Sequence, residues 1–441
     1  MTSFHIETYG SNSNFADAEY MAGLLKQAKF ELKEKSEEAD IVIFNVNLAE
    51  SSKSAYINRL EEIKNNYPYK FIIITGCVSR SEQEKLTKFS LLGTRNIHRI
   101  VEVVEEALNE NVVKIFETSE MPPLNLPKIK RNPFVEIIPI NRGCQGVCMC
   151  PKNKNVGAGE TFQLFQSYPL KDIVDVAEKA VRDGVKEILL TSQDTLCYGL
   201  DIGTTLPALL QELIKIPGNF KIRIDQGNPI HLKTIKRDLF PLLAHEKIFR
   251  FLHIPIQTGS NAVLKHMHER NTAEEYAGYV TELKHLYPEL TLVTDIIVGY
   301  PTEKDEDFAA TQKLLREISP DIINLSSFLP KTKKTAAKIK LSSLSAEVVT
   351  HRLKIVTDLF HNISLLQNER WIGWEGEIII SEKVKESDEG NDEGNKNKIP
   401  RWIGRNLSYK PVLVEGNFKL GDIVKARIER VTVLDLRGKV I

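Results

Sequence analysis

The residues whose type and spacing most directly suggest chemistry are the five cysteines, Cys77, Cys144, Cys148, Cys150 and Cys197. An odd and small number of cysteines in a chain of 441 residues argues against a disulfide framework. Three of them, Cys144, Cys148 and Cys150, fall within seven residues, and we call them the cysteine triplet. Thiolates are soft ligands that hold iron and other metals. The triplet therefore predicts a metal or cluster site, with an incidental loop as the alternative, whereas Cys197 is interpreted as a buried or incidental thiol.

The elements that would position Cys77 lie in residues 1–118, where short apolar strands alternate with amphipathic helices. The segments Phe4–Tyr9, Ile41–Val46 and Phe71–Thr75 have the pattern of strands. This alternation predicts a doubly wound α/β domain, in which a parallel sheet is covered on both faces. Such domains place their binding sites at the carboxyl ends of the strands.

The cysteine triplet belongs to residues 134–368, which follow a proline-rich linker at 119–133. The strand candidates in this segment are Val135–Ile140, Glu187–Thr191, Phe220–Ile224, Phe251–Ile256, Leu290–Val298 and Asp321–Ser327. Because amphipathic helices follow most of them, the segment predicts an open, partial (β/α)6 barrel with its site on the loops after the strands. The triplet directly follows the first strand, where a barrel would place its chemistry.

Residues 369–441 have the pattern of a small β-barrel of the oligonucleotide-binding type, with a polar, flexible insert at 383–400. The predicted strands are Pro411–Val414, Asp422–Ile428 and Val431–Leu436. From Arg401 to the end of the chain nine basic residues stand against four acidic ones, an excess of five positive charges. Basic side chains beside Trp402 and Tyr409 suit RNA contact through phosphates and stacking, and a solvated basic face is the alternative.

The overall composition limits the partners and the compartment. Lysine and arginine number 59, as do aspartate and glutamate, so the formal net charge is zero and any contact with nucleic acid must come from local basic patches. The longest apolar runs, such as Phe71–Ile74, are too short to cross a bilayer, and the start of the chain shows no secretory signal. The expected compartment is the cytoplasm, with no membrane partner.

Longer motifs occur in a fixed order along the chain. They are Glu7-Thr8-Tyr9-Gly10 with Ala16-Asp17-Ala18-Glu19, Cys144-Gln145-Gly146-Val147-Cys148, Leu190-Thr191-Ser192-Gln193-Asp194-Thr195, Leu252–Ser260, Thr294–Pro301, and Trp402-Ile403-Gly404-Arg405-Asn406 with Tyr409-Lys410-Pro411-Val412. Together they resemble the radical-SAM methylthiotransferase family over nearly the whole chain. Within that family the chain looks most like the archaeal and eukaryotic branch that acts on N6-threonylcarbamoyladenosine (t6A) in tRNA, and its last domain is TRAM-like.

The resemblance implies cofactors, partners and site residues. The cysteine triplet would hold a [4Fe-4S] cluster that binds S-adenosylmethionine and, with an electron donor, cleaves it to a radical that takes hydrogen from the adenine ring. Three N-terminal cysteines would hold a second, auxiliary [4Fe-4S] cluster, which supplies the sulfur. The predicted S-adenosylmethionine contacts are Ser192, Asp194 and Asp295, and the predicted tRNA contacts are Trp402, Arg405, Tyr409 and Lys410.

The chain departs from the family pattern at both cluster motifs. The radical-SAM motif spaces its cysteines as C-x3-C-x2-C, but here the third comes one residue early at Cys150, and Pro151 stands in its place. In the N-terminal domain Ser11 and Asn47 occupy the places of two auxiliary cysteines, and only Cys77 remains as a ligand. A hydroxyl and a carboxamide are poor iron ligands beside thiolates, so these replacements argue against the auxiliary cluster.

Three functions therefore follow from the sequence. The first is the family activity, radical-SAM methylthiolation of t6A beside the anticodon. The second is a catalytically degenerate paralogue that binds tRNA through its basic tail. The third is a radical-SAM enzyme that cleaves S-adenosylmethionine but lacks the sulfur-donating auxiliary cluster.

One further polar residue, His253, is interpreted as a strand-end histidine with satisfied hydrogen bonds rather than as a general base.

Overall fold

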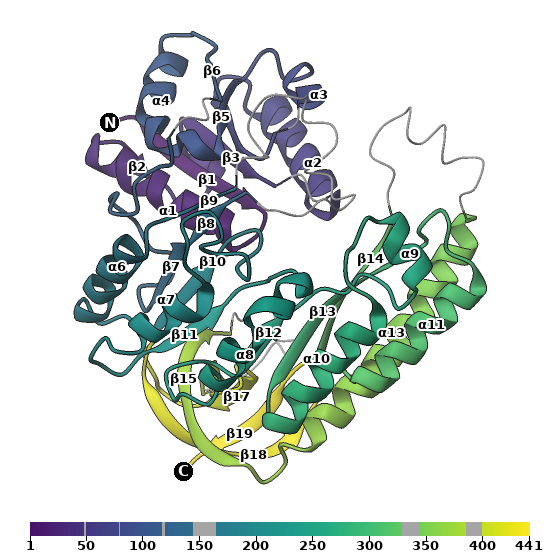
Figure 1. Ribbon diagram of the computed structural model, residues 1–441. Helices are drawn as coiled ribbons and strands as arrows, with labels where there is room; N and C mark the ends of the chain where they lie inside the picture. Colours follow the sequence, from purple (N-terminus) through teal and green to yellow (C-terminus); the bar gives the residue numbers. More distant parts are fainter. Residues whose placement is uncertain (48–49, 79, 117–119, 144–164, 329–343, 385–398) are drawn as a thin grey trace. The chain divides into compact units, whose positions relative to one another are not determined.

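The computed structural model describes residues 1–47, 50–78, 80–116, 120–143, 165–328, 344–384 and 399–441 (Figure 1). The chain forms two compact units. Unit 1 comprises Met1–Lys179 with Leu190–Thr204, and unit 2 comprises Ala180–Leu189 with Thr205–Ile441. Within the described ranges no helix is long and apolar enough to cross a membrane.

Unit 1 begins with a six-stranded sheet in the order β2-β1-β3-β4-β5-β6, and every neighbouring pair of strands is parallel. The strands are β1 (Ser3–Tyr9), β2 (Glu31–Leu32), β3 (Ile41–Val46), β4 (Phe71–Gly76), β5 (Ser90–Gly93) and β6 (Lys114–Ile115). The parallel sheet and its three longest strands are predicted correctly by the sequence. The other three strands have only two to four residues, too few to show a periodic pattern.

Helices cover both faces of this sheet, because alternate residues of each strand point to opposite sides. On one face Ile41, Ile43 and Ile73 pack against the buried side chains of α1 (Asn12–Gln27) and α4 (Ile100–Leu108). On the other face the intervening Val42 and Phe44 pack against α2 (Glu50–Asn66). The doubly wound arrangement predicted from the sequence is confirmed. Burial of each such side chain contributes about 1.5–3 kcal/mol.

The remaining α-helices and strands that lie mainly in unit 1 are the short helix α3 (Arg80–Gln83), β7 (Val135–Pro139), the antiparallel pair β8 (Asn141–Arg142) and β9 (Gln166–Ser167), and α6 (Leu170–Arg182). The strand β10 (Glu187–Thr191) is divided between the units, and its last two residues belong to unit 1. All six strands predicted for residues 134–368 are present.

In unit 2 the second half of the predicted barrel forms a parallel sheet of three strands, β12 (Phe251–His253), β13 (Thr291–Val298) and β14 (Ile322–Ser327). Strand β11 (Lys221–Ile224) also lies in unit 2. The helices of unit 2 are α7 (Leu206–Leu213), α8 (Leu232–Leu242), α9 (Asn261–His266), α10 (Ala273–Leu286), α11 (Asp305–Ile318) and α13 (Ala346–Glu369).

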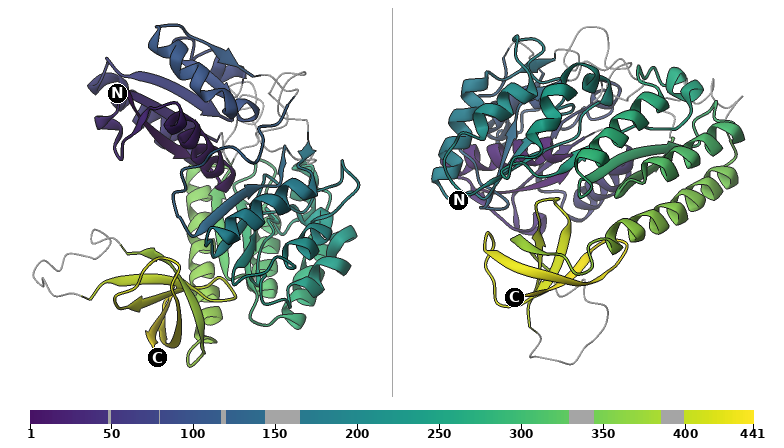
Figure 2. Two further views of the ribbon diagram at one scale, coloured as in Figure 1. Left: turned by 90° about the vertical axis from the view of Figure 1, so that its left-hand side faces the viewer. Right: turned by 60° about the horizontal axis from the view of Figure 1, so that its bottom comes forward.

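The chain ends in a closed β-barrel in the order β15-β16-β17-β19-β18 (Figure 2). The strands are β15 (Glu375–Lys383), β16 (Arg401–Arg405), β17 (Pro411–Glu415), β18 (Ile423–Val431) and β19 (Leu436–Val440). The predicted strand Val431–Leu436 is wrong. Thr432 and Asp435 close a turn there, with Thr432 N donating to Asp435 O at 2.8 Å. Of the predicted insert at 383–400, residues 385–398 lie outside the described residues.

Candidate functional site

Three strands of the N-terminal sheet end side by side. In the parallel register Tyr9 pairs with Val46, and Val46 pairs with Gly76. Backbone hydrogen bonds extend the pairing by one residue, from Asn47 N to Tyr9 O at 2.7 Å and from Cys77 N to Val46 O at 2.9 Å. The strand order β2-β1-β3 reverses at this point. Doubly wound sheets bind their ligands at such a switch point, beyond the carboxyl ends of the strands.

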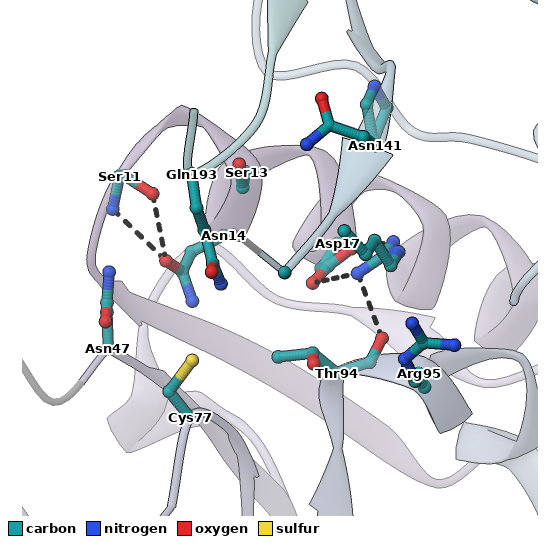
Figure 3. A pocket seen from close by; sticks show the side chains of 13 residues that line it. Ser11, Ser13, Asn14, Asp17, Asn47, Cys77, Thr94, Arg95, Asn141 and Gln193 are labelled. Carbon is teal, nitrogen blue, oxygen red and sulfur yellow. Dashed lines mark hydrogen bonds and ion pairs between the residues drawn. The ribbon is translucent and has the colours of Figure 1, made fainter. Parts of the chain in front are cut away.

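Ser11, Asn47 and Cys77 follow these strand ends and line one small pocket (Figure 3). Most of its other lining groups are hydroxyls, carboxamides and the guanidinium groups of Arg95 and Arg142. The cavity volume is about 30 Å³, which is room for one or two water molecules. Cys77 is buried, and it is not bonded to Cys197, the other cysteine in the described part of the chain. The structure thus brings the remaining N-terminal cysteine together with the two residues that replace its partners.

The carboxamide of Asn14 connects the loops on one side of this pocket. Its Oδ1 accepts hydrogen bonds from Ser11 N at 3.2 Å and Ser11 Oγ at 3.4 Å. Its Nδ2 donates to Asn45 Oδ1 at 3.2 Å and Val46 O at 3.4 Å, and Asn45 Nδ2 donates back to Asn14 O at 2.6 Å. By contrast, Asn47 Oδ1 is buried and has no hydrogen-bond partner among the described residues.

A buried ion pair lies on the other side of the pocket. Arg142 donates from Nη2 to Asp17 Oδ1 at 2.7 Å and from Nη1 to Asp17 Oδ2 at 3.2 Å. The guanidinium also donates to Thr94 O at 3.0 Å and to the hydroxyl of Tyr168 at 3.2 Å. Burial raises the pKa of Asp17, and the charge and hydrogen bonds of Arg142 oppose this effect. The pair fastens β8, from which the cysteine triplet follows, to α1.

This pair was not predicted from the sequence, although a signal was present. Asp17 stands four residues before Met21, and residues at that spacing share one face of a helix. Met21 is fully buried, so a carboxylate on its face needs a cationic partner. The identity of that partner, 125 residues further along the chain, has no local signal.

Two of the predicted cofactor-binding residues lie together after β10. Asp194 N donates to Ser192 Oγ at 3.0 Å, and both side chains are buried. The backbone oxygen of Asp194 accepts from Asn141 Nδ2 at 3.3 Å and from Cys197 Sγ at 3.1 Å. Cys197 is fully buried, in agreement with its interpretation as a buried thiol. The contact of Ser192 and Asp194 with a cofactor stays a prediction.

The third predicted cofactor residue, Asp295, is in unit 2. Its Oδ1 lies 2.6 Å from His253 Nε2 and accepts from Asn324 Nδ2 at 2.8 Å. These side chains come from the neighbouring strands β12, β13 and β14. His253 Nε2 therefore has hydrogen-bonding partners at the strand ends. Binding of a cofactor by Asp295 stays a prediction.

The four predicted RNA contacts make extensive interactions inside unit 2. Trp402 is buried in the barrel and donates from Nε1 to Gly416 O at 3.0 Å. The ring of Tyr409 lies under the guanidinium carbons of Arg223 and Arg405, at 4.5 and 4.7 Å from its centroid. Burial raises the pKa of Tyr409 to about 12.

The fourth residue, Lys410, is almost fully buried. Its Nζ lies 2.7 Å from Asp321 Oδ1, and the two side chains are 5% and 1% exposed. The same ammonium group donates to Asn368 Oδ1 at 2.8 Å. In this structure the charge of Lys410 is therefore neutralised within unit 2. Contact of these four residues with RNA stays a prediction.

The last two strands, β18 and β19, carry exposed basic residues. Lys425, Arg427, Arg437 and Lys439 are all exposed, and we call these four residues the basic strand pair. Arg427 lies directly opposite Lys439 in the antiparallel register. Like charges at opposite positions disfavour strand pairing, but a polyanion would neutralise them. The geometry of this surface suits a phosphate backbone.

Models of three protein families match successive parts of the chain. Uncharacterized protein family UPF0004 matches residues 3–92, the Radical SAM superfamily matches residues 138–315, and the TRAM domain matches residues 393–441. The second and third descriptions agree with the radical-SAM core and TRAM-like barrel expected from the sequence.

Relatives match nearly the whole chain. The probable threonylcarbamoyladenosine tRNA methylthiotransferase of Methanothermobacter thermautotrophicus is 33% identical over 417 residues, 93% of each chain. The chain belongs to the radical-SAM methylthiotransferase family. The probable threonylcarbamoyladenosine tRNA methylthiotransferase of Pyrococcus abyssi is 32% identical over 437 residues, 97% of each chain. The human threonylcarbamoyladenosine tRNA methylthiotransferase is 32% identical over 93% of this chain and 69% of its own length.

Among solved structures, the radical enzyme OxsB with aqua-cobalamin and S-adenosylmethionine bound covers 80% of this chain. The match spans 56% of OxsB, with 13% identity and a TM-score of 0.49. These values are too low to support a closer comparison.

Membership of the methylthiotransferase family implies two iron–sulfur clusters, and the residues of the N-terminal pocket do not fit the auxiliary one. Only Cys77 offers a thiolate, the hydroxyl of Ser11 is bonded to Asn14, and Asn47 offers a carboxamide. The cysteine triplet of the radical-SAM motif, like Pro151, lies outside the described residues.

Proposed function

We propose that this chain is a radical enzyme that uses S-adenosylmethionine and acts on t6A beside the anticodon of tRNA. The observation that carries the proposal is the extent of the match, because relatives named for that substrate are 32–33% identical over 93–97% of this chain. The radical-SAM and TRAM matches support the same combination of cofactor and RNA substrate. A reductant is the further partner that this reaction requires.

In the proposed enzyme the cysteine triplet would hold the [4Fe-4S] cluster that, when bound, supplies the electron for cleavage of S-adenosylmethionine. Ser192, Asp194 and Asp295 are the proposed contacts to that cofactor. At the end of β10, Asp194 N donates to Ser192 Oγ and Cys197 Sγ donates to Asp194 O, and these hydrogen bonds orient the Ser192–Asp194 turn. Asp295 is on β13, and hydrogen bonds from His253 on β12 and Asn324 on β14 to its Oδ1 orient the carboxylate.

For tRNA we propose contact through the basic strand pair, in addition to the sequence-based residues Trp402, Arg405, Tyr409 and Lys410. Arg427 is 58% exposed and lies 3.8 Å from Glu375, and Arg437 is 48% exposed and lies 3.2 Å from Asp435. Phosphates would compete with these two carboxylates for the guanidinium groups. Each phosphate contact would release counterions and make binding dependent on salt. Tyr409 and Lys410 also stabilise unit 2 through their buried aromatic and ionic contacts.

The family reaction adds a methylthio group, and this is the first candidate for the product. A second candidate is favoured by the N-terminal pocket, where Ser11 and Asn47 replace thiolates beside Cys77. In that case S-adenosylmethionine is cleaved on t6A-containing tRNA, but no sulfur is inserted from an auxiliary cluster.

One experiment tests the proposal and separates the two products. The full chain is reconstituted anaerobically with iron and sulfide, then incubated with S-adenosylmethionine, a reductant and t6A-containing tRNA. Formation of 5′-deoxyadenosine and the mass of the tRNA nucleosides are measured, with Cys144→Ala as control. A methylthio nucleoside supports the first candidate, and cleavage without it supports the second. No cleavage above the Cys144→Ala control would contradict both.

A further inference from the structure

We propose that the N-terminal pocket of the native chain binds no iron–sulfur cluster but keeps the backbone of a three-ligand site. Two substitutions, Ser11→Cys and Asn47→Cys, would then complete with Cys77 a [4Fe-4S] site. This inference depends on the geometry of unit 1 and is independent of the reaction proposed for tRNA.

The backbone brings the three positions together. Asn47 N and Cys77 N bond to Tyr9 O and Val46 O, so the residues after β1, β3 and β4 continue the spacing of the sheet. Neighbouring strands lie about 5 Å apart, so ligands on three consecutive strand ends start within about 10 Å of one another. A Cβ atom built on Gly10 would lie 2.9 Å from Asn47 Cβ, which shows how closely the first two loops approach.

Gly76 allows the end of β4 to approach the end of β3 closely. Its φ is +103°, and a Cβ atom there would lie 2.1 Å from Val46 O. Only glycine fits this close approach, and it places Cys77 directly beyond the end of β3. Figure 3 shows the sulfur of Cys77 on the same side of the pocket as Asn47 and Ser11. The scaffold therefore does not depend on the missing thiols.

The two native replacements explain why no cluster forms there. A [4Fe-4S] cluster needs thiolate ligands, and neither a hydroxyl nor a carboxamide supplies the charge and softness of a thiolate. One thiolate alone does not hold a cluster against hydrolysis or loss of iron. The native pocket is instead a polar space held by Asn14 and Asn45.

Both substitutions are compatible with the surrounding contacts. Ser11 is the N-cap of α1, and its Oγ donates to Asn14 Oδ1 only at 3.4 Å. Exchange of oxygen for sulfur weakens this cap. Asn47 Oδ1 is buried without a partner among the described residues, so its removal also eliminates an unsatisfied acceptor. At position 47 the thiol side chain is also smaller than the carboxamide that it replaces. The links between Asn14 and Asn45 involve neither substituted side chain.

The test uses the full chain with the cysteine triplet replaced by alanine, so that iron reports only on the N-terminal pocket. After anaerobic reconstitution with iron and sulfide, this background is expected to hold no iron above its level in a Cys77→Ser version. Adding S11C and N47C to the background should raise the content to about four irons per chain, one cubane cluster, with the corresponding visible absorption and electron paramagnetic resonance signal of the reduced cluster. Adding Cys77→Ser to this variant should remove that iron again.

Two results would overturn the proposal. Iron in the background chain that disappears with Cys77→Ser would show that the native pocket already holds a cluster. Failure of the S11C/N47C chain to gain iron would show that the backbone does not keep the site. The conclusion is the same whether or not circular dichroism shows the variant to be folded, because the proposal includes tolerance of both substitutions. Neither tRNA nor S-adenosylmethionine is present, so the outcome does not depend on the proposed function.

Discussion

Replacement of Asp17 by asparagine is expected to destabilise unit 1 strongly. The carboxylate of Asp17 accepts two hydrogen bonds from Arg142, and the side chains are 3% and 10% exposed. Asparagine keeps the shape but leaves the guanidinium charge buried without a counter-charge. Loss of one partner of a buried ion pair costs about 3–5 kcal/mol. At about 2–4 °C per kcal/mol for a unit of this size, the melting temperature of unit 1 should fall by roughly 6 to 20 °C.

The assay is thermal unfolding followed by calorimetry, with Glu102→Gln as the matched control in the same unit. Glu102 pairs with Arg99 at 2.7 Å, but its side chain is 49% exposed. Solvent screens such a pair, so its loss should cost at most about 1 kcal/mol. If D17N and E102Q melted at the same temperature, the reasoning that the Asp17–Arg142 pair is buried and coupled would be refuted.

Three further predictions concern other parts of the chain. Burial raises the pKa of Glu19 to about 7, so between pH 4.5 and pH 7 the folded chain holds a proton that the unfolded chain has released. The free energy of unfolding should therefore fall by about 3 kcal/mol between pH 4.5 and pH 8 because of this residue. Thermal melting curves of E19Q should lack that fall. Lys410→Met should destabilise unit 2 by about 3–5 kcal/mol in urea unfolding followed by tryptophan fluorescence, because it breaks the buried pair with Asp321. Lys215→Met, at an exposed position, should leave the stability unchanged. Equal urea midpoints for the two variants would contradict the stabilising role of the Lys410–Asp321 pair. The double variant R427Q/K439Q should lower the slope of log affinity for tRNA against log salt by about 1.5, at 0.7–0.9 per phosphate contact, and an unchanged slope would exclude this surface.

Much of the fold could be predicted from local patterns. Ile41–Val46 and Phe71–Gly76 are apolar runs of strand length between amphipathic helices, and both are central strands of the sheet. The two-residue strands β2 and β6 could not be predicted, because they pair only through neighbours distant in the sequence. In the barrel, Val431–Leu436 has a β-branched, apolar composition, but hydrogen bonds between Thr432 and Asp435 turn the chain there.

The candidate site was predicted in part. The motif positions Ser11, Asn47 and Cys77 could be named from the sequence, and the parallel sheet explains why they converge. The partner of Asp17 could not, because Arg142 is brought to it only by tertiary packing. The partner of Lys410 could not be predicted either. The basic composition of the last segment indicated RNA contact, whereas tertiary packing places Lys410 in a buried ion pair with Asp321.

The central claim is that this chain performs radical chemistry on t6A in tRNA. The most direct measurement is the yield of 5′-deoxyadenosine and altered nucleoside from two otherwise identical tRNAs, one with the threonylcarbamoyl group and one with unmodified adenosine. The account predicts an altered nucleoside, accompanied by S-adenosylmethionine cleavage, only from the t6A-containing tRNA. Equal cleavage with both tRNAs and no altered nucleoside from either would contradict it.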